Sequence, residues 1–183
     1  MRELYRKGLV RGGVRAREKI MENMRKEILD ILRNNAKISA KEVGSMIGKS
    51  EAAVADEIKK LEDEKVILQY KTLINYGKLD SDYAEGLIEV KVEPQREMGY
   101  DRIAERIYRF DEVKAVYLMS GAYDLSVHVE ASTMKQISEF VFEKLAVMEG
   151  VRSTATYFIM RKYKEHGVVF VDEEKDERLV ISP

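Results

Sequence analysis

The apolar residues of this chain change from helical to strand spacing between residues 61 and 84, and that change restricts the fold more than any other feature. From Met24 to about residue 61 they recur every three to four positions, the period of helices with one buried face. Over residues 84–92 they alternate with charged residues, the period of a strand with one buried face. A polar, turn-rich stretch over residues 75–82 separates the two patterns. The sequence therefore predicts a helical unit followed by a unit that contains a sheet.

The first pattern predicts three helices in a helix-turn-helix arrangement. Ser39 and Glu42 have the spacing of a capping box, which begins the second helix. Gly48 ends that helix, and Ser50 caps the third helix after one intervening residue. The positions expected to face the core are Met24, Ile28, Ile31, Leu32, Val43, Met46, Ile47, Val54, Ile58 and Leu61. Two short helices joined by a tight turn and packed on a longer helix form this unit, and the extended run over residues 66–70 follows it as a wing or a hinge.

The second pattern predicts strands and helices in the order β-α-β-β-α-β. The expected strands are residues 84–92, 113–119, 125–130 and 151 to about 163, and the expected inward helix residues are Ile103, Ile107, Phe110, Ile137, Phe140, Val141, Leu145 and Met148. This order is that of the ferredoxin-like fold, an antiparallel four-stranded sheet with two helices on one face. The predicted fold class is α+β, a winged or plain helix-turn-helix followed by a βαββαβ ferredoxin-like domain.

The sheet face opposite the two helices has no cover in this prediction. The residues assigned to it are Leu87, Val116, Leu118, Tyr157 and Ile159. Such a face is too apolar to stay in water, so we expect it to be an oligomer surface. The segment from residue 168 onward has two apolar triplets around a charged run, which predicts either a hairpin that extends the sheet or a solvated loop.

Composition excludes several functions. With 32 Lys and Arg against 33 Asp and Glu the net charge is -1, so nucleic-acid binding requires a local charge asymmetry. The chain has no cysteine, which excludes disulfides, thiolate metal sites and thiol nucleophiles. His128 and His166 lie far apart, and no P-loop or nucleophile motif is present, so we expect no catalytic site, metal or cofactor. No apolar run approaches the length of a membrane span, and the expected location is the cytoplasm.

The local asymmetry lies at the start of the chain. Residues 1–26 hold nine Lys and Arg against three Glu, and the glycine pair at 12 and 13 argues against a continuous helix there. One interpretation is a basic arm that contacts DNA. The other is a disordered tail or an upstream translation start.

Several short motifs resemble the Lrp/AsnC family, the leucine-responsive and asparagine-responsive transcription regulators. In the first unit they are Ile28-Leu29-x-x-Leu32, Ala36-x-Ile38-Ser39, Glu42-Val43, Gly48-x-Ser50, Val54-x-x-x-Ile58-x-x-Leu61-Glu62 and Val66-Ile67. In the second they are the run from Val116 to Asp124, with its G-x-x-D turn, and Gly150-Val151-x-x-Thr154-x-Thr156. Haem-pathway decarboxylases of similar fold are not matched, because the segment 124–128 lacks their His- and Arg-rich strand.

The resemblance implies a homodimer that assembles into tetramers or octamers, binds operator DNA and senses a small molecule, usually an amino acid. Because the N-terminal part of a recognition helix meets base edges and its later residues approach the backbone, the expected DNA contacts are Lys49, Ser50, Ala52, Ala53, Asp56, Lys59 and Lys60. The expected effector contacts are Ser120, Gly121, Asp124, Thr154 and Thr156. The alternative for Gly121 and Asp124 is an ordinary turn, and threonines are also common in strands.

The chain departs from the family's pattern in its third helix. Residues 50–65 hold six acidic and three basic residues, and Lys65 stands where a glycine is common. Acidic side chains repel phosphate, so the alternative function is an oligomeric ligand-binding or protein-interaction protein that has lost DNA binding. The expected domains are a basic arm at 1–23, a DNA-binding domain at 24–72, a hinge at 73–82, an effector-binding and oligomerisation domain at 83–163, and a charged tail or hairpin at 164–183.

Overall fold

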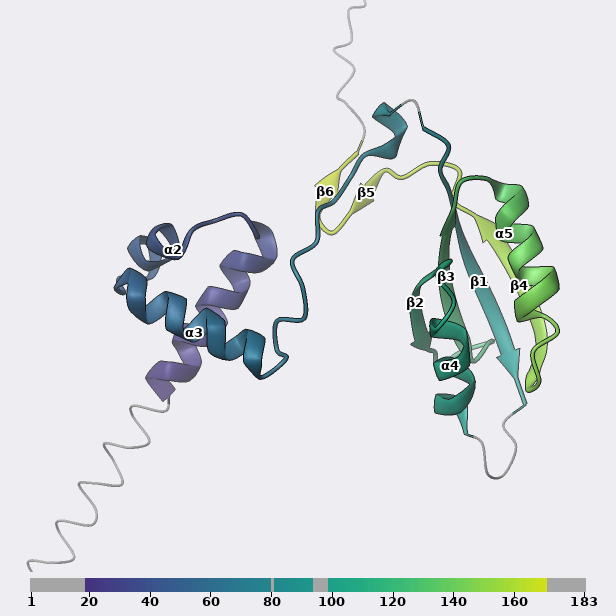
Figure 1. Ribbon diagram of the computed structural model, residues 1–183, viewed down its shortest axis with the longest axis horizontal. Helices are drawn as coiled ribbons and strands as arrows, with labels where there is room; N and C mark the ends of the chain where they lie inside the picture. Colours follow the sequence, from purple (N-terminus) through teal and green to yellow (C-terminus); the bar gives the residue numbers. More distant parts are fainter. Residues whose placement is uncertain (1–18, 80, 94–98, 171–183) are drawn as a thin grey trace, which may run out of the picture. The chain divides into compact units, whose positions relative to one another are not determined.

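The computed structural model describes residues 19–79, 81–93 and 99–170. The chain divides into two compact units between Leu73 and Ile74 (Figure 1). The predicted hinge, residues 73–82, is therefore divided: Leu73 belongs to the first unit and the rest to the second. The basic arm up to residue 18 and the tail from residue 171 lie outside the described residues.

The first unit is the predicted group of three helices, formed by residues 19–34, α2 (Ala40–Ile47) and α3 (Glu51–Asp63). The capping box is confirmed, because the Ser39 hydroxyl accepts from the Glu42 N–H at 3.2 Å and the Glu42 carboxylate accepts from the Ser39 N–H at 2.9 Å. Gly48 ends α2 in the left-handed region at φ 66°, and Ser50 caps α3. The buried core residues are Met24, Ile28, Leu32, Val43, Val54 and Leu61.

Two details of this unit differ from the prediction. The first helix is already formed at residue 19, five positions before its expected start. Met46 is 65% exposed rather than buried, because Val43, Gly44 and Ile47 define the inward face of the short α2 and Met46 falls to one side of it.

The turn after α3 explains why a glycine is common at the position that Lys65 occupies in this chain. Lys65 has φ 60°, a left-handed conformation that costs a residue with a side chain about 1–2 kcal/mol. It lets the N–H groups of Val66 and Ile67 both donate to the Leu61 carbonyl, at 2.9 and 3.0 Å. The following residues 68–70 take part in no strand, so this segment forms no strand-paired wing in the described structure.

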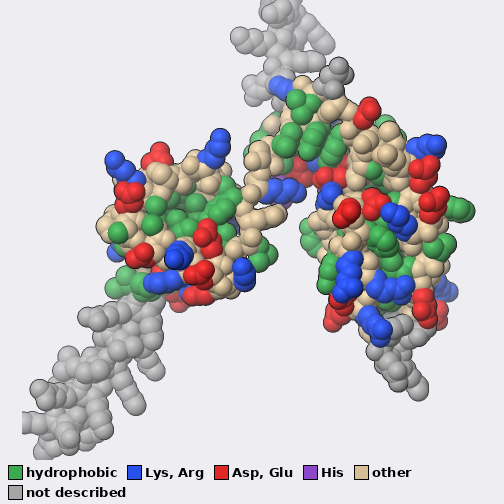
Figure 2. Space-filling view, in the orientation of Figure 1, with side chains coloured by type: hydrophobic (Ala, Val, Ile, Leu, Met, Phe, Trp, Pro, Cys, Tyr) green, Lys and Arg blue, Asp and Glu red, His purple; other side chains and the backbone are tan. Residues whose placement is uncertain are grey.

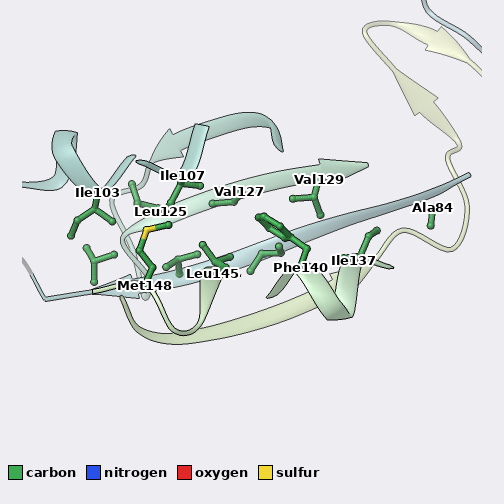
Figure 3. Packing of buried hydrophobic residues seen from close by; sticks show 13 residues of the cluster. Ala84, Ile103, Ile107, Leu125, Val127, Val129, Ile137, Phe140, Leu145 and Met148 are labelled. Atoms are coloured by element: carbon green, nitrogen blue, oxygen red, sulfur yellow. The ribbon is translucent and has the colours of Figure 1, made fainter. Parts of the chain in front are cut away.

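The second unit has the predicted ferredoxin-like topology. Its elements are η1 (Tyr76–Lys78), β1 (Ala84–Val92), α4 (Tyr100–Tyr108), β2 (Val113–Leu118), β3 (Leu125–Ala131), α5 (Met134–Phe140), η2 (Val141–Leu145), β4 (Val151–Phe158), β5 (Lys164–Glu165) and β6 (Val168–Val169). The main sheet is antiparallel in the order β2-β3-β1-β4. Its core packs α4 and α5 side chains, including Ile107 and Phe140, against strand residues such as Val127 (Figure 3).

The strand register corrects the assignment of the open sheet face. Val116 pairs with Val127, and Leu118 with Leu125, so both lie on the face that the helices cover. Leu87 pairs with Tyr157 across β1 and β4, on the opposite, open face. The period of two predicts alternation within a strand, but only the pairing of strands shows which set faces the helices.

The C-terminal part of the unit also differs from the prediction. β4 ends at Phe158 rather than near residue 163, because its pairing with β1 ends at Gly86, the partner of Phe158. β5 and β6 then form a separate two-stranded hairpin, in which the first apolar triplet pairs with residues 164–165. The second triplet, at residues 179–181, lies outside the described residues, so the predicted hairpin between the two triplets stays a prediction. The predicted last helix changes to a π-helical turn at Val141 and continues to Leu145.

Candidate functional site

The expected DNA-contacting residues share one side of the turn and of α3. All seven are exposed: Lys49, Ser50, Ala52, Ala53, Asp56, Lys59 and Lys60. Ser50 also caps the helix, since its hydroxyl accepts from the Ala53 N–H at 3.3 Å. The helical spacing of these positions therefore presents them to a common partner.

The excess of acidic residues in α3 overstates the negative charge of this surface. Glu57 is only 2% exposed and points into the unit, where its carboxylate lies 3.1 Å from the Arg25 Nε and 3.4 Å from the Lys60 Nζ. Arg25, from the first helix, also pairs with Glu64. The expected contact surface itself holds three lysines and one aspartate. Acidic and basic side chains are interspersed over the visible face of the unit (Figure 2).

Sequence reasoning missed the Arg25–Glu57 pair, although a signal was present. Glu57 follows Val54 by three positions and precedes Leu61 by four, the spacing of the inward face of α3. A carboxylate at an inward position requires a partner, since an unpaired buried charge is costly. Its partner, Arg25, comes from the helix on which α3 packs.

Gly44 sets the distance between α2 and the turn into α3. A Cβ at this position would lie 2.6 Å from the backbone carbonyl oxygen of Lys49, closer than such atoms approach. Glycine is therefore required where the two helices of the motif come together.

In the second unit, Asp124 is part of the backbone framework. Its Oδ2 accepts from the Val92 N–H at 2.9 Å, and its Oδ1 lies 3.5 Å from the Tyr100 hydroxyl, which donates. The Asp124 N–H donates to the Val90 carbonyl at 3.0 Å. The residue thus joins the β2–β3 turn to the end of β1.

The other expected effector residues occupy two places. Ser120 and Gly121 are exposed in the turn, and a Cβ on Gly121 would meet nothing within 4 Å. Thr154 and Thr156 pair with Val90 and Ile88 and are partly buried on the helix-covered face. Because β1 lies between β3 and β4, a single chain does not bring the threonines beside the turn.

A charged cluster that the sequence did not reveal surrounds Glu85. Its side chain is only 3% exposed, and its carboxylate contacts His128, the Lys162 Nζ at 2.7 Å and the Tyr83 hydroxyl at 3.1 Å. Burial raises the pKa of Glu85, but the hydrogen bond and charge of Lys162 outweigh it and hold the pKa below its ordinary value. Burial and the charge of Glu85 raise the pKa of Tyr83. The alternation of residues along β1 puts Glu85 on the open sheet face. Its side chain is buried only because His128 and Lys162, from distant segments, cover it.

The part of the chain that the structure describes contains neither a metal-ligand cluster nor a membrane-spanning helix. The described residues include no group of three His, Asp or Glu side chains that could hold a metal ion. None of the described helices is long and apolar enough to cross a membrane.

Known proteins match both units. Residues 21–67 match the family described as winged helix-turn-helix DNA-binding, and residues 85–169 match the Lrp/AsnC ligand binding domain. YugG of Bacillus subtilis (strain 168), described as an uncharacterized HTH-type transcriptional regulator, is 45% identical over 158 residues, which cover 86% of this chain and 95% of YugG.

Solved structures share the fold. E. coli AsnC superimposes with a TM-score of 0.61 at 18% identity, covering 78% of this chain and 94% of AsnC. The transcriptional regulator NMB0573 of Neisseria meningitidis, solved as a complex with L-Met, has a TM-score of 0.64 at 20% identity, covering 78% of this chain and 91% of that one. Together with the full-length similarity to YugG, these matches show that the chain belongs to the Lrp/AsnC family of DNA-binding transcriptional regulators, which are not enzymes.

Proposed function

We propose that this regulator acts in the cytoplasm and contacts operator DNA through Lys49, Ser50, Ala52, Ala53, Asp56, Lys59 and Lys60, while its basic N-terminal arm supplies further phosphate contacts. The observation that carries the proposal is the charge of these seven exposed contact residues, three lysines and one aspartate, with Glu57 turned inward. Lysines on an exposed helix face attract phosphates. This surface is too small to provide many cationic contacts, so the arm is the natural complement.

Removal of the arm's charge should weaken binding to all DNA sequences alike. Residues 1–18 hold six basic and two acidic residues. We expect a deletion of residues 1–18 to reduce the log-log salt slope by about one unit for each phosphate interaction that the deletion removes. Fluorescence anisotropy with the gene's own upstream region and with an unrelated duplex, over a range of salt, measures both effects.

Two further variants separate the effect of the arm's charge from that of its length, and phosphate contacts from the recognition of base sequence. An arm of full length with its six basic residues changed to Gln should behave like the deletion. Lys49→Ala should mainly change the preference between the two duplexes. An unchanged slope in both arm variants would remove the arm from the interface, and a full chain that binds neither duplex would overturn the proposed DNA contacts.

We also propose that an amino acid is the effector and that Asp124 contacts its ammonium group. NMB0573 was solved with L-Met, and the feast or famine regulatory protein of M. tuberculosis was also solved with L-methionine. In this chain Asp124 belongs to the same β2–β3 turn as the exposed Ser120 and Gly121. Thr154 and Thr156 would join the site from another protomer, since β1 separates them from the turn of their own chain.

The structure indicates which Asp124 variant tests this proposal. Asp124→Ala would remove the acceptor for the Val92 N–H as well as the charge, whereas Asp124→Asn keeps an acceptor oxygen. We expect Asp124→Asn to lose calorimetrically measured amino-acid binding while its melting temperature stays close to that of the parent chain. Glu139→Gln, on the exposed side of α5, is the matched control. Unchanged affinity in Asp124→Asn would exclude this residue from the effector site.

The proposed assembly is a dimer that forms tetramers or octamers. On the open sheet face, Tyr117 is 59% exposed and Tyr157 is 52% exposed, beside the half-buried Leu87. A face with large rings in water favours pairing with a second copy. Light scattering at micromolar concentration should give a mass of at least twice 21.2 kDa. A stable species at the single-chain mass would contradict this expectation.

A further inference from the structure

The second unit contains a cavity that none of the expected effector residues lines. Its volume is about 590 Å³, within the range of small-molecule sites. It lies where residues 74–85 meet the segment that follows β4. The lining residues are Ile74, Asn75, Tyr76, Gly77, Lys78, Leu79, Ser81, Tyr83, Glu85, Ile159, Met160, Arg161, Lys162 and Phe170.

Contacts within the unit hold the walls of this cavity in place. The rings of Tyr76 and Tyr83 stack with their centroids 4.0 Å apart. The Asn75 side-chain amide donates to the Phe170 carbonyl at 3.1 Å, and the Phe170 N–H donates to the Tyr163 carbonyl at 3.0 Å. The two segments that form the cavity are therefore joined to each other, and the cavity does not depend on one loop alone.

Apolar side chains form the rim. Leu79 is 54% exposed, Met160 is 80% exposed, and Ile74 and Ile159 also face solvent. Hydrophobic side chains gather around η1 in the space-filling view (Figure 2). A ligand with an apolar body would bury this surface, which is favourable in proportion to the apolar area removed from water.

The carboxylate that lines the cavity is paired with a cation, whereas one cationic side chain of the lining, Arg161, has no acidic partner among the described residues. Among the described residues, the one carboxylate of the lining is Glu85, and the Lys162 ammonium group already pairs with it. The guanidinium carbon of Arg161 lies 5.1 Å from the centroid of the Tyr163 ring. No carboxylate of the described residues lies within ion-pair distance of this guanidinium. Lys162 pairs with both Glu85 and Glu165, so the cation of the lining to which a ligand carboxylate would bind is Arg161.

We propose that this cavity binds a small organic anion, a carboxylate attached to an aromatic or other apolar body, with Arg161 as the partner of the carboxylate. Arginine is well suited to this role because its planar guanidinium donates two parallel hydrogen bonds to a carboxylate. The stacked tyrosines and Phe170 bind the apolar body. The site is independent of the proposed amino-acid effector, since the described lining residues offer an ammonium group no unpaired carboxylate.

Three probes of similar size test the required charge on the full-length protein. Phenylacetate, phenylethyl alcohol and phenethylamine carry an anionic, a neutral and a cationic group on closely matched skeletons. We expect calorimetry to show phenylacetate binding at millimolar concentration and much weaker binding of the other two. Arg161→Gln should weaken phenylacetate binding about tenfold, the effect of removing one charge-assisted hydrogen-bonded pair. Arg152→Gln, an exposed arginine of β4 outside the cavity, should leave it unchanged.

Hydrogen exchange locates the bound probe. Phenylacetate should slow exchange in residues 74–83 and 159–170. Protection confined to residues 118–124 would place the probe at the β2–β3 turn and overturn the proposal. Equal or stronger binding of the alcohol or the amine would also overturn it, as would the failure of all three probes to bind or an unchanged affinity in Arg161→Gln. None of these outcomes depends on whether Asp124 binds an amino acid.

Discussion

Gly44→Ala should strongly destabilise the DNA-binding unit and weaken operator binding while the second unit keeps its stability. The added methyl group would lie 2.6 Å from the Lys49 carbonyl oxygen, a backbone atom that cannot move without separating α2 from the start of α3. Overpacking of this kind costs about 1–3 kcal/mol. A single core in a unit this small rarely supplies more than about 3–5 kcal/mol, so the cost is a large share of its stability.

Hydrogen exchange resolved by segment measures this result. Residues 24–63 should lose protection in Gly44→Ala, whereas the strands of the second unit keep theirs. Gly121→Ala is the matched control, since its added Cβ has nothing within 4 Å. Native protection of α2 and α3 in Gly44→Ala would mean that the turn relaxes to admit a methyl group.

Arg25→Met should lower the free energy of unfolding of the first unit by about 2–4 kcal/mol, because it leaves the buried Glu57 carboxylate with only the exposed Lys60 as partner. Glu57→Leu alone should cost less, and the double variant Arg25→Met, Glu57→Leu should recover most of the stability, since apolar replacements for a buried ion pair are often tolerated. Denaturant unfolding of the four proteins gives the coupling energy.

The neighbouring lysine provides the control for this cycle. Lys26 pairs with Glu22 at 2.7 Å, but both side chains are about two-thirds exposed. Lys26→Met should therefore change stability by less than about 1 kcal/mol. Equal losses of stability in Arg25→Met and Lys26→Met would show that burial of Glu57 has no energetic consequence.

Local patterns predicted most of the fold. The capping box at Ser39, the glycine end of α2 at Gly48 and the N-cap at Ser50 depend on residues within four positions of one another, so they can be read directly. The alternation in β1 is local in the same sense. The family resemblance then related these elements to DNA binding, and the similarity to known regulators confirms that relation.

The candidate sites were less predictable because their chemistry depends on distant segments. Asp124 was identified as a turn residue with a carboxylate, but its bond to the Val92 N–H became visible only when the turn was placed beside β1. Glu57 was counted with the acidic residues of α3, although Arg25 from another helix compensates it.

Residues a few positions apart specify the order of the elements, their caps and the two hydrophobic periods, so the amino-acid sequence is sufficient for these features. Three others required the folded chain: Val116 and Leu118 face the helices, β4 ends at Phe158, and Glu85 is enclosed by Tyr83, His128 and Lys162. The physical reason is that strand register and charge compensation join segments far apart in the chain. A periodic pattern specifies how residues alternate, but not which partner each one meets.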